Sequence, residues 1–182
     1  MEETKEKILK EAGKLFSEFG FSGVSMENIA KKLNITKAAL YFHFKSKNEI
    51  YLKVLERAFQ ELMAEIEREI SKAKSFKDSV FGLISSYLKF GLREKNLIKA
   101  IFLKIPKRDK EIENFIAEKR KEIERKFKEI LAKKKILEKT NLNFLVTSLL
   151  GIMDKLILEA SFFGKRLDIK KSVFRILRIL KI

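Results

Sequence analysis

The chain has 182 residues, of which 46% are hydrophobic and 36% charged, so it can bury a substantial core as one domain or as two small ones. It contains no cysteine, which excludes disulfides, thiolate metal sites and cysteine nucleophiles. Its formal net charge of +16 suggests an anionic partner, with nucleic acid first among the candidates and acidic lipid or a carboxylate ligand behind.

Three features bear on location and source. No apolar stretch at the start resembles a signal peptide, which favours a cytoplasmic protein. The longest mostly apolar stretch, Leu142 to Met153, is too short to span a bilayer. Lys, Glu and Ile are abundant while Gln60 is the only glutamine, a bias that resembles the proteins of hyperthermophiles. We therefore expect a cytoplasmic protein from a thermophile.

Hydrophobic periodicity predicts helices nearly throughout, and no segment shows a strand pattern. Apolar residues at spacings of three and four predict a first helix from about Thr4 to Phe19, ended by Gly20. Its apolar face consists of Ile8, Ala12, Leu15, Phe16 and Phe19.

Two short helices are predicted next, joined by a tight turn. Ser25 can cap the first helix, and Asn34 suits the left-handed position at which that helix ends. Thr36 can cap the second helix, which runs from about Lys37 to His43. The inward residues of the two helices are Met26, Ile29, Ala30, Leu33, Leu40 and Phe44.

A long fourth helix is predicted to begin at a capping box. In this motif Ser46 accepts a hydrogen bond from the Glu49 amide, and the Glu49 side chain reaches back to Ser46. The apolar face of this helix consists of Ile50, Val54, Ala58, Leu62, Ile66 and Ile70. A second box at Ser75 and Asp78 opens a fifth helix, expected to end near Asn96. Its inward residues are Val80, Ile84, Tyr87 and Leu88.

The remaining chain is predicted to add four helices, which makes the fold all-α with about nine helices. A short piece from Leu97 to Lys104 stops before Pro106, the only proline. Asp109 can begin a seventh helix, Thr140 or Asn141 can cap an eighth that Gly164 ends, and Asp168 can cap a ninth. The apolar face of the seventh helix consists of Ile112, Phe115, Ile116, Ile123, Phe127 and Ile130.

A short helix, a tight turn and a second helix with exposed polar and aromatic side chains are typical of a helix-turn-helix. Residues 4–52 resemble the DNA-binding domain of the TetR/AcrR family of bacterial and archaeal transcriptional regulators. The positions that match the family pattern are Phe16, Gly20, Ile29, Ala30, Leu33, Leu40, Tyr41, His43, Phe44, Lys45 and Lys47. The resemblance implies a helix-turn-helix DNA-binding domain at 1–47 and a ligand-binding and dimerisation domain at 48–182.

The resemblance also implies which residues contact DNA. Lys37 can donate to guanine, and the methyl groups of Ala38 and Ala39 can meet thymine methyls. Tyr41 can present its ring to a base or sugar and its hydroxyl to phosphate. Further candidates are Ser25, Thr36, Phe42, His43 and Lys47, the last two as phosphate ligands. Many family members have tyrosine at position 42, so Phe42 is expected to pack or to touch the sugar-phosphate backbone apolarly.

For the second domain the resemblance implies a homodimer on a palindromic operator and a small ligand that releases DNA. Helices eight and nine would pair with their symmetry mates, through a face that periodicity leaves open. The dimer candidates are Leu142, Leu145, Leu149, Met153, Leu156, Ala160, Ile169, Val173, Ile176, Leu177 and Leu180. The ligand candidates are Phe59, Met63, Phe81, Ile84, Tyr87, Phe102, Phe115, Phe144, Thr147 and Met153, with Tyr87 and Thr147 as polar handles.

Residues 97–139 carry fifteen basic against eight acidic residues, which favours an anionic ligand head group, such as that of a fatty acid or acyl-thioester. Two other function classes remain. An enzyme is disfavoured, because one histidine, no cysteine and no Gly-rich phosphate loop leave no usual catalytic, metal or cofactor site. The second class is a basic helical protein that binds acidic membrane lipid through residues 97–139, although the segment's apolar stripe suits a bundle core. We expect no cofactor, no metal and no membrane partner.

Overall fold

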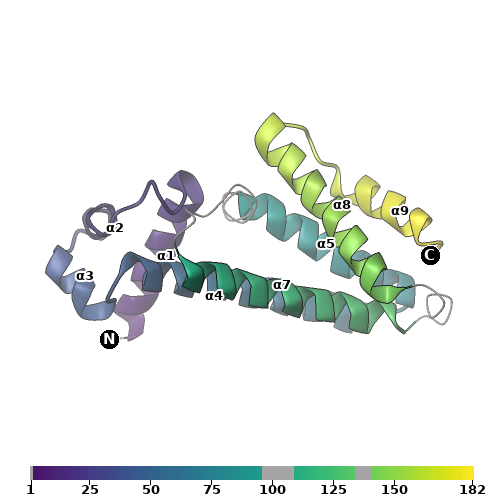
Figure 1. Ribbon diagram of the computed structural model, residues 1–182, viewed down its shortest axis with the longest axis horizontal. Coiled ribbons are helices and arrows are strands. Elements are labelled where there is room, and N and C mark those ends of the chain that lie inside the picture. Colours follow the sequence, from purple (N-terminus) through teal and green to yellow (C-terminus); the bar gives the residue numbers. More distant parts are fainter. Residues whose placement is uncertain (1, 96–108, 134–140) are drawn as a thin grey trace. The chain divides into compact units, whose positions relative to one another are not determined.

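The computed structural model describes residues 2–95, 109–133 and 141–182, and within these ranges it contains eight helices and no strand. The helices are α1 (Glu2–Phe19), α2 (Met26–Leu33), α3 (Lys37–His43), α4 (Lys47–Lys72), α5 (Phe76–Arg93), α7 (Lys110–Leu131), α8 (Leu142–Phe163) and α9 (Ile169–Ile179), as labelled in Figure 1. The all-α prediction is therefore confirmed. The predicted helical piece at 97–104 lies outside the described residues.

The chain forms two compact units, and α4 runs through both. The N-terminal unit extends to Phe59 and includes the start of α7 up to Ile116, and the C-terminal unit begins at Gln60 and at Ala117. The predicted functional division at residue 47 is a separate matter and stays a prediction.

The core of the N-terminal unit is built from one face of each of its short helices. In α1 the fully buried residues recur every fourth position, and α2 and α3 close over them with the predicted inward side chains. The core residues of these helices and of the turn that ends α3 are Ile8, Ala12, Phe16, Met26, Ile29, Ala30, Leu40 and Phe44. Leu33 is only half-buried, and Phe19, predicted on the apolar face of α1, is 57% exposed because it lies at the helix end beside the turn.

The predicted apolar face of α4 is partly wrong. Val54, Ala58 and Ile70 are half-buried, whereas Tyr51, Leu55 and Phe59 are buried. The prediction followed a strict four-residue spacing, but an α-helix has 3.6 residues per turn, so such a row drifts around the axis. The buried face mixes spacings of three and four, which returns it to Leu62 and Ile66.

Helix ends in the N-terminal unit form as predicted, with one correction. Ser25 and Thr36 accept hydrogen bonds from the amides of Asn28 and Ala39, and Asn34 adopts the left-handed conformation with φ 56°. At α4 the Glu49 amide donates to Ser46 Oγ at 3.1 Å, as expected. The Glu49 carboxylate, however, accepts from the Lys45 amide, one residue before the predicted one, at 2.6 Å. The cap therefore holds the α3–α4 turn as well.

In the C-terminal unit α5 packs against both α8 and α9. All four predicted inward residues of α5 are buried, and burial extends without a break from residue 82 to residue 88. Close approach of α5 and α8 requires a glycine, because a Cβ at Gly91 would lie 2.2 Å from Ile157 Cδ1. Among the described residues no helix is both long and apolar enough to cross a membrane.

Helices α8 and α9 bury one apolar face and expose another. Of the residues predicted for the dimer, Leu149, Met153, Val173, Ile176, Leu177 and Leu180 are buried within the chain. The exposed large apolar side chains of these two helices are Phe144, Ile152, Phe162, Phe163, Phe174 and Ile179. Gly151 lies among them with no atom within 4 Å of an added Cβ. The chain therefore buries six of the candidates itself and exposes further apolar side chains, while the other candidates, Leu142, Leu145, Leu156, Ala160 and Ile169, are half-buried.

Candidate nucleic-acid interface

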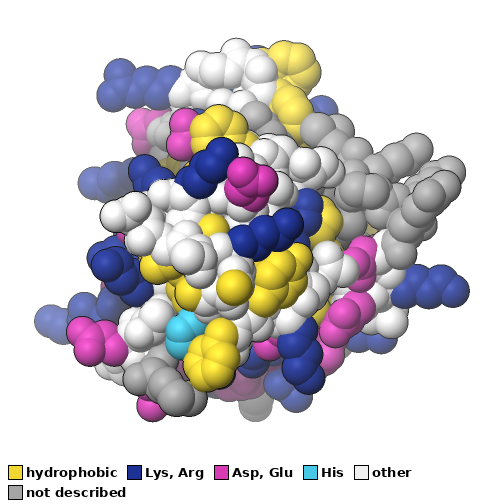
Figure 2. Space-filling view, turned by 90° about the vertical axis from the view of Figure 1, so that its left-hand side faces the viewer, with side chains coloured by type: hydrophobic (Ala, Val, Ile, Leu, Met, Phe, Trp, Pro, Cys, Tyr) yellow, Lys and Arg dark blue, Asp and Glu magenta, His cyan; other side chains and the backbone are white. Residues whose placement is uncertain are grey.

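The outer face of α3 brings together the predicted base-reading residues. Lys37, Ala38 and Ala39 are exposed, and the Tyr41 and Phe42 side chains are 47% and 75% exposed. Leu40 and Phe44, by contrast, lie in the core at 0% and 4% exposure and hold the helix in place. Helix α3 thus presents polar, methyl and aromatic groups to solvent from a fixed backbone. Figure 2 shows this face of the molecule, where the single histidine lies beside hydrophobic side chains with Lys and Arg around them.

The aromatic residues of α3 do not pack inward as a half-buried tyrosine usually would. Tyr41 lies one turn beyond Lys37 on the same face, so both side chains can reach one partner. The Phe42 ring meets the His43 ring edge-on, with their centroids 5.3 Å apart. His43 is half-buried, and its imidazole is held by this contact next to the exposed ring. An exposed phenyl group at position 42 supplies an apolar contact and no hydroxyl.

The two capping hydroxyls differ in whether they still have a proton to donate to a phosphate. Ser25 Oγ accepts from the Asn28 amide at 3.1 Å and lies 2.6 Å from Asn28 Oδ1, to which it donates its only proton. The Ser25 amide donates to the same Oδ1 at 2.8 Å. Thr36 Oγ1 accepts from the Ala39 amide at 3.1 Å, and a hydroxyl that accepts can still donate. Thr36 is therefore the better phosphate ligand of the two.

The sequence does not indicate the contacts that the Lys47 side chain makes. Its Nζ donates to the carbonyl oxygens of Phe21 and Val24, both at 2.9 Å, and lies 4.1 Å from the centre of the Phe21 ring. The side chain is half-buried, and burial lowers the pKa of its ammonium group. Two of its three N–H donors are thus directed into the protein. The predicted role of Lys47 as a phosphate ligand stays a prediction that these contacts do not favour.

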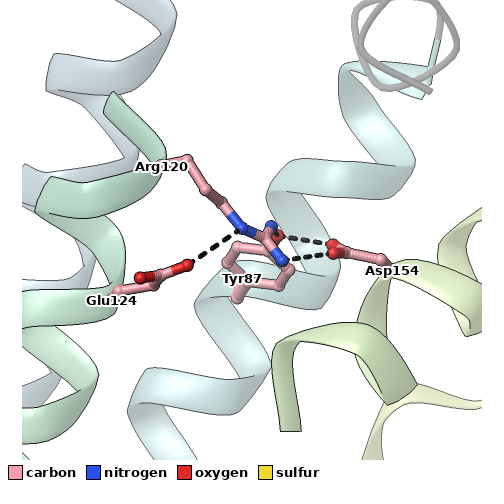
Figure 3. Close-up of polar contacts among 4 residues, drawn as sticks. All are labelled: Tyr87, Arg120, Glu124 and Asp154. Carbon is pink, nitrogen blue, oxygen red and sulfur yellow. Dashed lines mark hydrogen bonds and ion pairs between the residues drawn. The ribbon is translucent and has the colours of Figure 1, made fainter. Parts of the chain in front are cut away.

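The C-terminal unit contains a polar cluster inside its helices, drawn in Figure 3. Arg120 of α7 donates to Tyr87 Oη of α5 and to Asp154 Oδ2 of α8, each at 2.6 Å. Tyr87 Oη donates to Asp154 Oδ1 at 2.5 Å, so the three side chains form a closed ring of hydrogen bonds. Glu124 lies 3.9 Å from Arg120 Nε. One cluster therefore joins three helices.

Burial and charge act together on the ionisation of this cluster. Burial, with the Asp154 charge added to it, raises the pKa of Tyr87 well above its usual value, so the phenol stays protonated. Burial alone would lower the pKa of Arg120, but Tyr87 and Asp154 outweigh it and raise that pKa. Asp154 is 3% exposed, and the ion pair with Arg120 compensates its desolvation. The cluster is therefore satisfied within itself.

The structure divides the predicted ligand residues among three settings. Ile84, Tyr87 and Met153 are buried in the C-terminal unit, where Met63 and Phe81 are half-buried and Phe81 contacts the ring of Phe174. Phe59 and Phe115 contact each other in the N-terminal unit, with ring centroids 6.3 Å apart. Phe144 and Thr147 are exposed on α8, and Phe102 lies outside the described residues. The structure thus does not gather all ten residues at one place.

The sequence reasoning found Tyr87 but missed Arg120, Glu124 and Asp154. Asp154 offered a signal, because it interrupts an apolar helix at a position where its neighbours Val146, Leu150 and Ile157 are buried. A charged residue on an apolar face requires a buried partner of opposite charge. Nothing in the sequence identifies which of the many cations that partner is.

The N-terminal segment matches a known family. Residues 8–54 match the family model described as "Bacterial regulatory proteins, tetR family". The match covers α2, α3, most of α1 and the start of α4. Residues 8–54 are therefore similar to the DNA-binding segment of the TetR family of regulators. This family consists of DNA-binding regulators rather than enzymes, in agreement with the prediction that the chain is not an enzyme.

Similar proteins extend the likeness beyond the helix-turn-helix. The negative transcriptional regulator IcaR of the biofilm operon icaADBC of Staphylococcus aureus (strain Newman) is 35% identical over 50% of this chain and 48% of its own. A TetR/AcrR-family regulator from Aquifex aeolicus is 27% identical over 97% and 99% of the two chains, with a TM-score of 0.77. The regulator FadR of Bacillus subtilis, solved with stearoyl-CoA, is 18% identical over 95% of each chain, with a TM-score of 0.79.

These comparisons bear differently on fold and on function. The match spans about half or less of the length of the curated relatives. The likeness to FadR, at 18% identity, shows that the two chains share a fold. The family assignment of the resemblance is confirmed, whereas the operator, the ligand and the assembly of this protein are matters for proposal.

Proposed function

We propose that this TetR-family regulator is a cytoplasmic repressor that binds a near-palindromic operator as a homodimer and leaves it when a lipophilic ligand binds. The observation that carries the DNA-binding part is the outer face of α3. Lys37 and Tyr41 are exposed one turn apart, while Leu40 between them is fully buried and fixes the helix. A rigid helix with an exposed cation and aromatic group is suited to read base edges in the major groove.

The second part of the proposal is the dimer. The exposed apolar side chains of α8 and α9 need a cover, because a contiguous apolar surface is unusual on a protein that works alone. A two-fold axis through α8 would place the open surface of Gly151 against the same residue of the second chain, where helices can approach closely. Two recognition helices then lie on one DNA face, with half-sites about 34–36 Å apart or a little more.

DNA binding and assembly are tested together by selection from a duplex pool of random sequence, followed by footprinting. The proposal expects an enriched near-palindrome and protection of two half-sites about one helical turn apart. Sedimentation of the DNA-free protein at micromolar concentration should show a dimer. Enrichment of an asymmetric site, or a monomer with intact helical content, would contradict the dimeric part of the proposal.

The third part is the ligand, for which we propose a long lipophilic molecule such as a fatty acid or acyl-thioester. Support comes from the apolar interior of the C-terminal unit around Ile84 and Met153 and from the fold shared with FadR. The cluster at Arg120 adds a condition. Arg120 already donates to Tyr87 and Asp154, so an anionic head group that binds Arg120 competes with the Asp154 carboxylate.

The ligand proposal has a direct test. Purified protein is extracted and analysed for bound lipid by mass spectrometry, and fatty acids and acyl-thioesters are then titrated against the complex with the selected duplex. Dissociation of DNA by these ligands, and not by a lipophilic cation of equal chain length, is the expected result. The opposite selectivity would show that the basic excess of residues 97–139 has no bearing on the head group.

The sequence also allowed a lipid-binding surface on the basic segment, and the structure disfavours it. Within residues 97–139 the structure describes residues 109–133, which contain α7. The apolar residues Ile112, Ile123, Phe127 and Ile130 of α7 are buried. Membrane-surface helices expose such a face to the bilayer.

A further inference from the structure

We propose that Lys47 is a positioning residue that fastens the α1–α2 loop to the first turn of α4 and so sets the point at which the chain enters the helix-turn-helix. This inference rests on the proposed DNA binding for its consequence, but its geometry lies wholly within the N-terminal unit. It replaces the expectation that Lys47 binds a DNA phosphate.

The position of Lys47 on α4 is unfavourable for a cation taken alone. Lys47 is the first residue of α4, where the helix dipole is positive and disfavours a positive side chain. The two loop carbonyls, at 2.9 Å each, and the face of the Phe21 ring at 4.1 Å compensate for this. The loop carbonyls therefore hold the Lys47 ammonium group in place, and the same hydrogen bonds hold the loop against α4.

The ring beneath Lys47 belongs to an aromatic cluster that joins three segments. The ring centroid of Phe21 in the loop lies 4.8 Å from that of Tyr51, which follows Lys47 by one turn of α4. The ring centroid of Tyr51 lies 4.9 Å from that of Phe16 in α1. Phe16 and Tyr51 are buried. The Phe21 side chain thus attaches the loop to the aromatic cluster, and the carbonyls of Phe21 and Val24 attach it to Lys47.

The second carbonyl connects this contact to the recognition unit. Val24 is buried at 2% exposure and is followed directly by Ser25, the N-cap of α2. A bond to the Val24 carbonyl therefore sets the place at which the chain enters α2, which in turn packs against α3. The adjacent Asn48 side chain donates to Asp109 at the start of α7, so the first turn of α4 contacts both the loop and α7.

Hydrogen exchange of the DNA-free protein tests the contact itself. Lys47→Met keeps most of the aliphatic side chain and removes the donors, whereas Lys47→Arg keeps charge and donors. Lys53→Met is the matched control, because Lys53 is an exposed cation of α4 that pairs with Glu56. We expect Lys47→Met to raise the exchange rates of amides 21–25 at least tenfold, with Lys53→Met unchanged and Lys47→Arg between them. Unchanged rates in Lys47→Met would overturn the inference, whether or not the protein binds DNA.

Salt dependence of DNA binding separates a positioning role from a phosphate contact. The probes are the duplex selected by the wild-type protein and a duplex of unrelated sequence. We expect Lys47→Met to weaken binding to the selected duplex about tenfold and to leave the slope of log K against log salt as in the wild type. A slope reduced by about one in Lys47→Met would restore the phosphate contact. Helical content by circular dichroism confirms that each variant is folded.

If the wild-type protein enriches no duplex from the random pool, the proposed function is refuted and the exchange result still stands. The two failures are therefore distinguishable.

Discussion

Three hydroxyl caps shape the helix ends of the N-terminal unit, whereas in the C-terminal unit a tyrosine, an arginine and an aspartate meet among helices. Ser25, Thr36 and Ser46 each bond a backbone amide three residues away. Arg120 instead bonds residues 33 and 34 positions distant in the chain. The first arrangement shapes short helices locally and leaves α3 free to face a partner. The second holds long helices together at one internal point.

The two units also treat a cation differently. Lys47 faces neutral carbonyl oxygens and an aromatic ring, so its positive charge remains uncancelled. The charge of Arg120 is cancelled by Asp154, which is nearly fully buried. The net charge of the chain alone does not reveal this difference between the two cations. The cation of the N-terminal unit thus holds a loop of its own chain, and the cation of the C-terminal unit joins α5, α7 and α8.

The largest effect is expected from Asp154→Asn, which leaves the Arg120 charge without a counter-ion. We expect a loss of about 3 kcal/mol in the free energy of unfolding, the low end of the range for buried pairs because 33% of the Arg120 side chain is exposed. Glu124→Gln, which removes a carboxylate 3.9 Å from the same guanidinium, should cost less than about 1 kcal/mol. Urea denaturation measures both. Equal losses would mean that the cluster does not hold the helices.

Substitutions of Gly91 and Gly13 allow the tightness of packing in the two units to be compared. Gly91→Ala places a Cβ against Ile157 and should lower the free energy of unfolding by about 1–3 kcal/mol. Gly13→Ala in α1 places its Cβ 3.5 Å from Val54, an ordinary contact, and should raise stability by up to about 1 kcal/mol through helix propensity. Thermal and urea unfolding of both variants decide this. An unchanged or higher stability of Gly91→Ala would show that the α5–α8 contact is looser than described.

The buried tyrosine of the N-terminal unit predicts a loss of stability in alkaline solution. Burial raises the pKa of Tyr51 to about 12 from its usual 10.0. Between these values the unfolded chain loses the phenolic proton while the folded protein keeps it, so stability falls as pH rises. The contribution of Tyr51 to this slope is about 1.4 kcal/mol per pH unit, and it should be missing in Tyr51→Phe. Urea denaturation of both proteins across this pH range checks the slope, and identical slopes would contradict the assignment.

The smallest expected effect is that of a single cap. Thr36→Ala removes the acceptor of the Ala39 amide and should cost about 1 kcal/mol of unfolding free energy. Thr36→Ser keeps the hydroxyl and should cost less. If Thr36→Ala instead costs nothing in stability but weakens DNA binding, the hydroxyl serves the phosphate and not the helix.

The features that could be predicted from the sequence are the ones that local chemistry determines. The bounds of α2 and α3 and their caps follow from Ser25, Asn34 and Thr36 and from the spacing of apolar residues. The burial of Leu40 and the exposure of Tyr41 follow from the same spacing. These residues lie within one or two turns of the groups they interact with, so a short stretch of sequence contains the whole interaction.

The features that were missed depend on residues far apart in the chain. Lys47 reaches carbonyls 23 and 26 residues away, and backbone carbonyls give no signal in a sequence. Arg120 is one of 41 Lys and Arg residues, and only the packing of α5, α7 and α8 singles it out as the partner of Asp154. The exposed face of α8 escaped prediction for a related reason, because apolar residues surround this helix on more than one side.

The most direct test of the central claim compares two tyrosines in one unit for binding to the duplex selected by the wild-type protein. Tyr41 is exposed on α3, and Tyr51 is buried in the core. Tyr41→Ala should weaken binding by about 1–3 kcal/mol and relax the preference over unrelated DNA, with unchanged helical content. Tyr51→Phe should retain wild-type affinity at neutral pH. Wild-type affinity and specificity in Tyr41→Ala would contradict the claim that the outer face of α3 reads DNA.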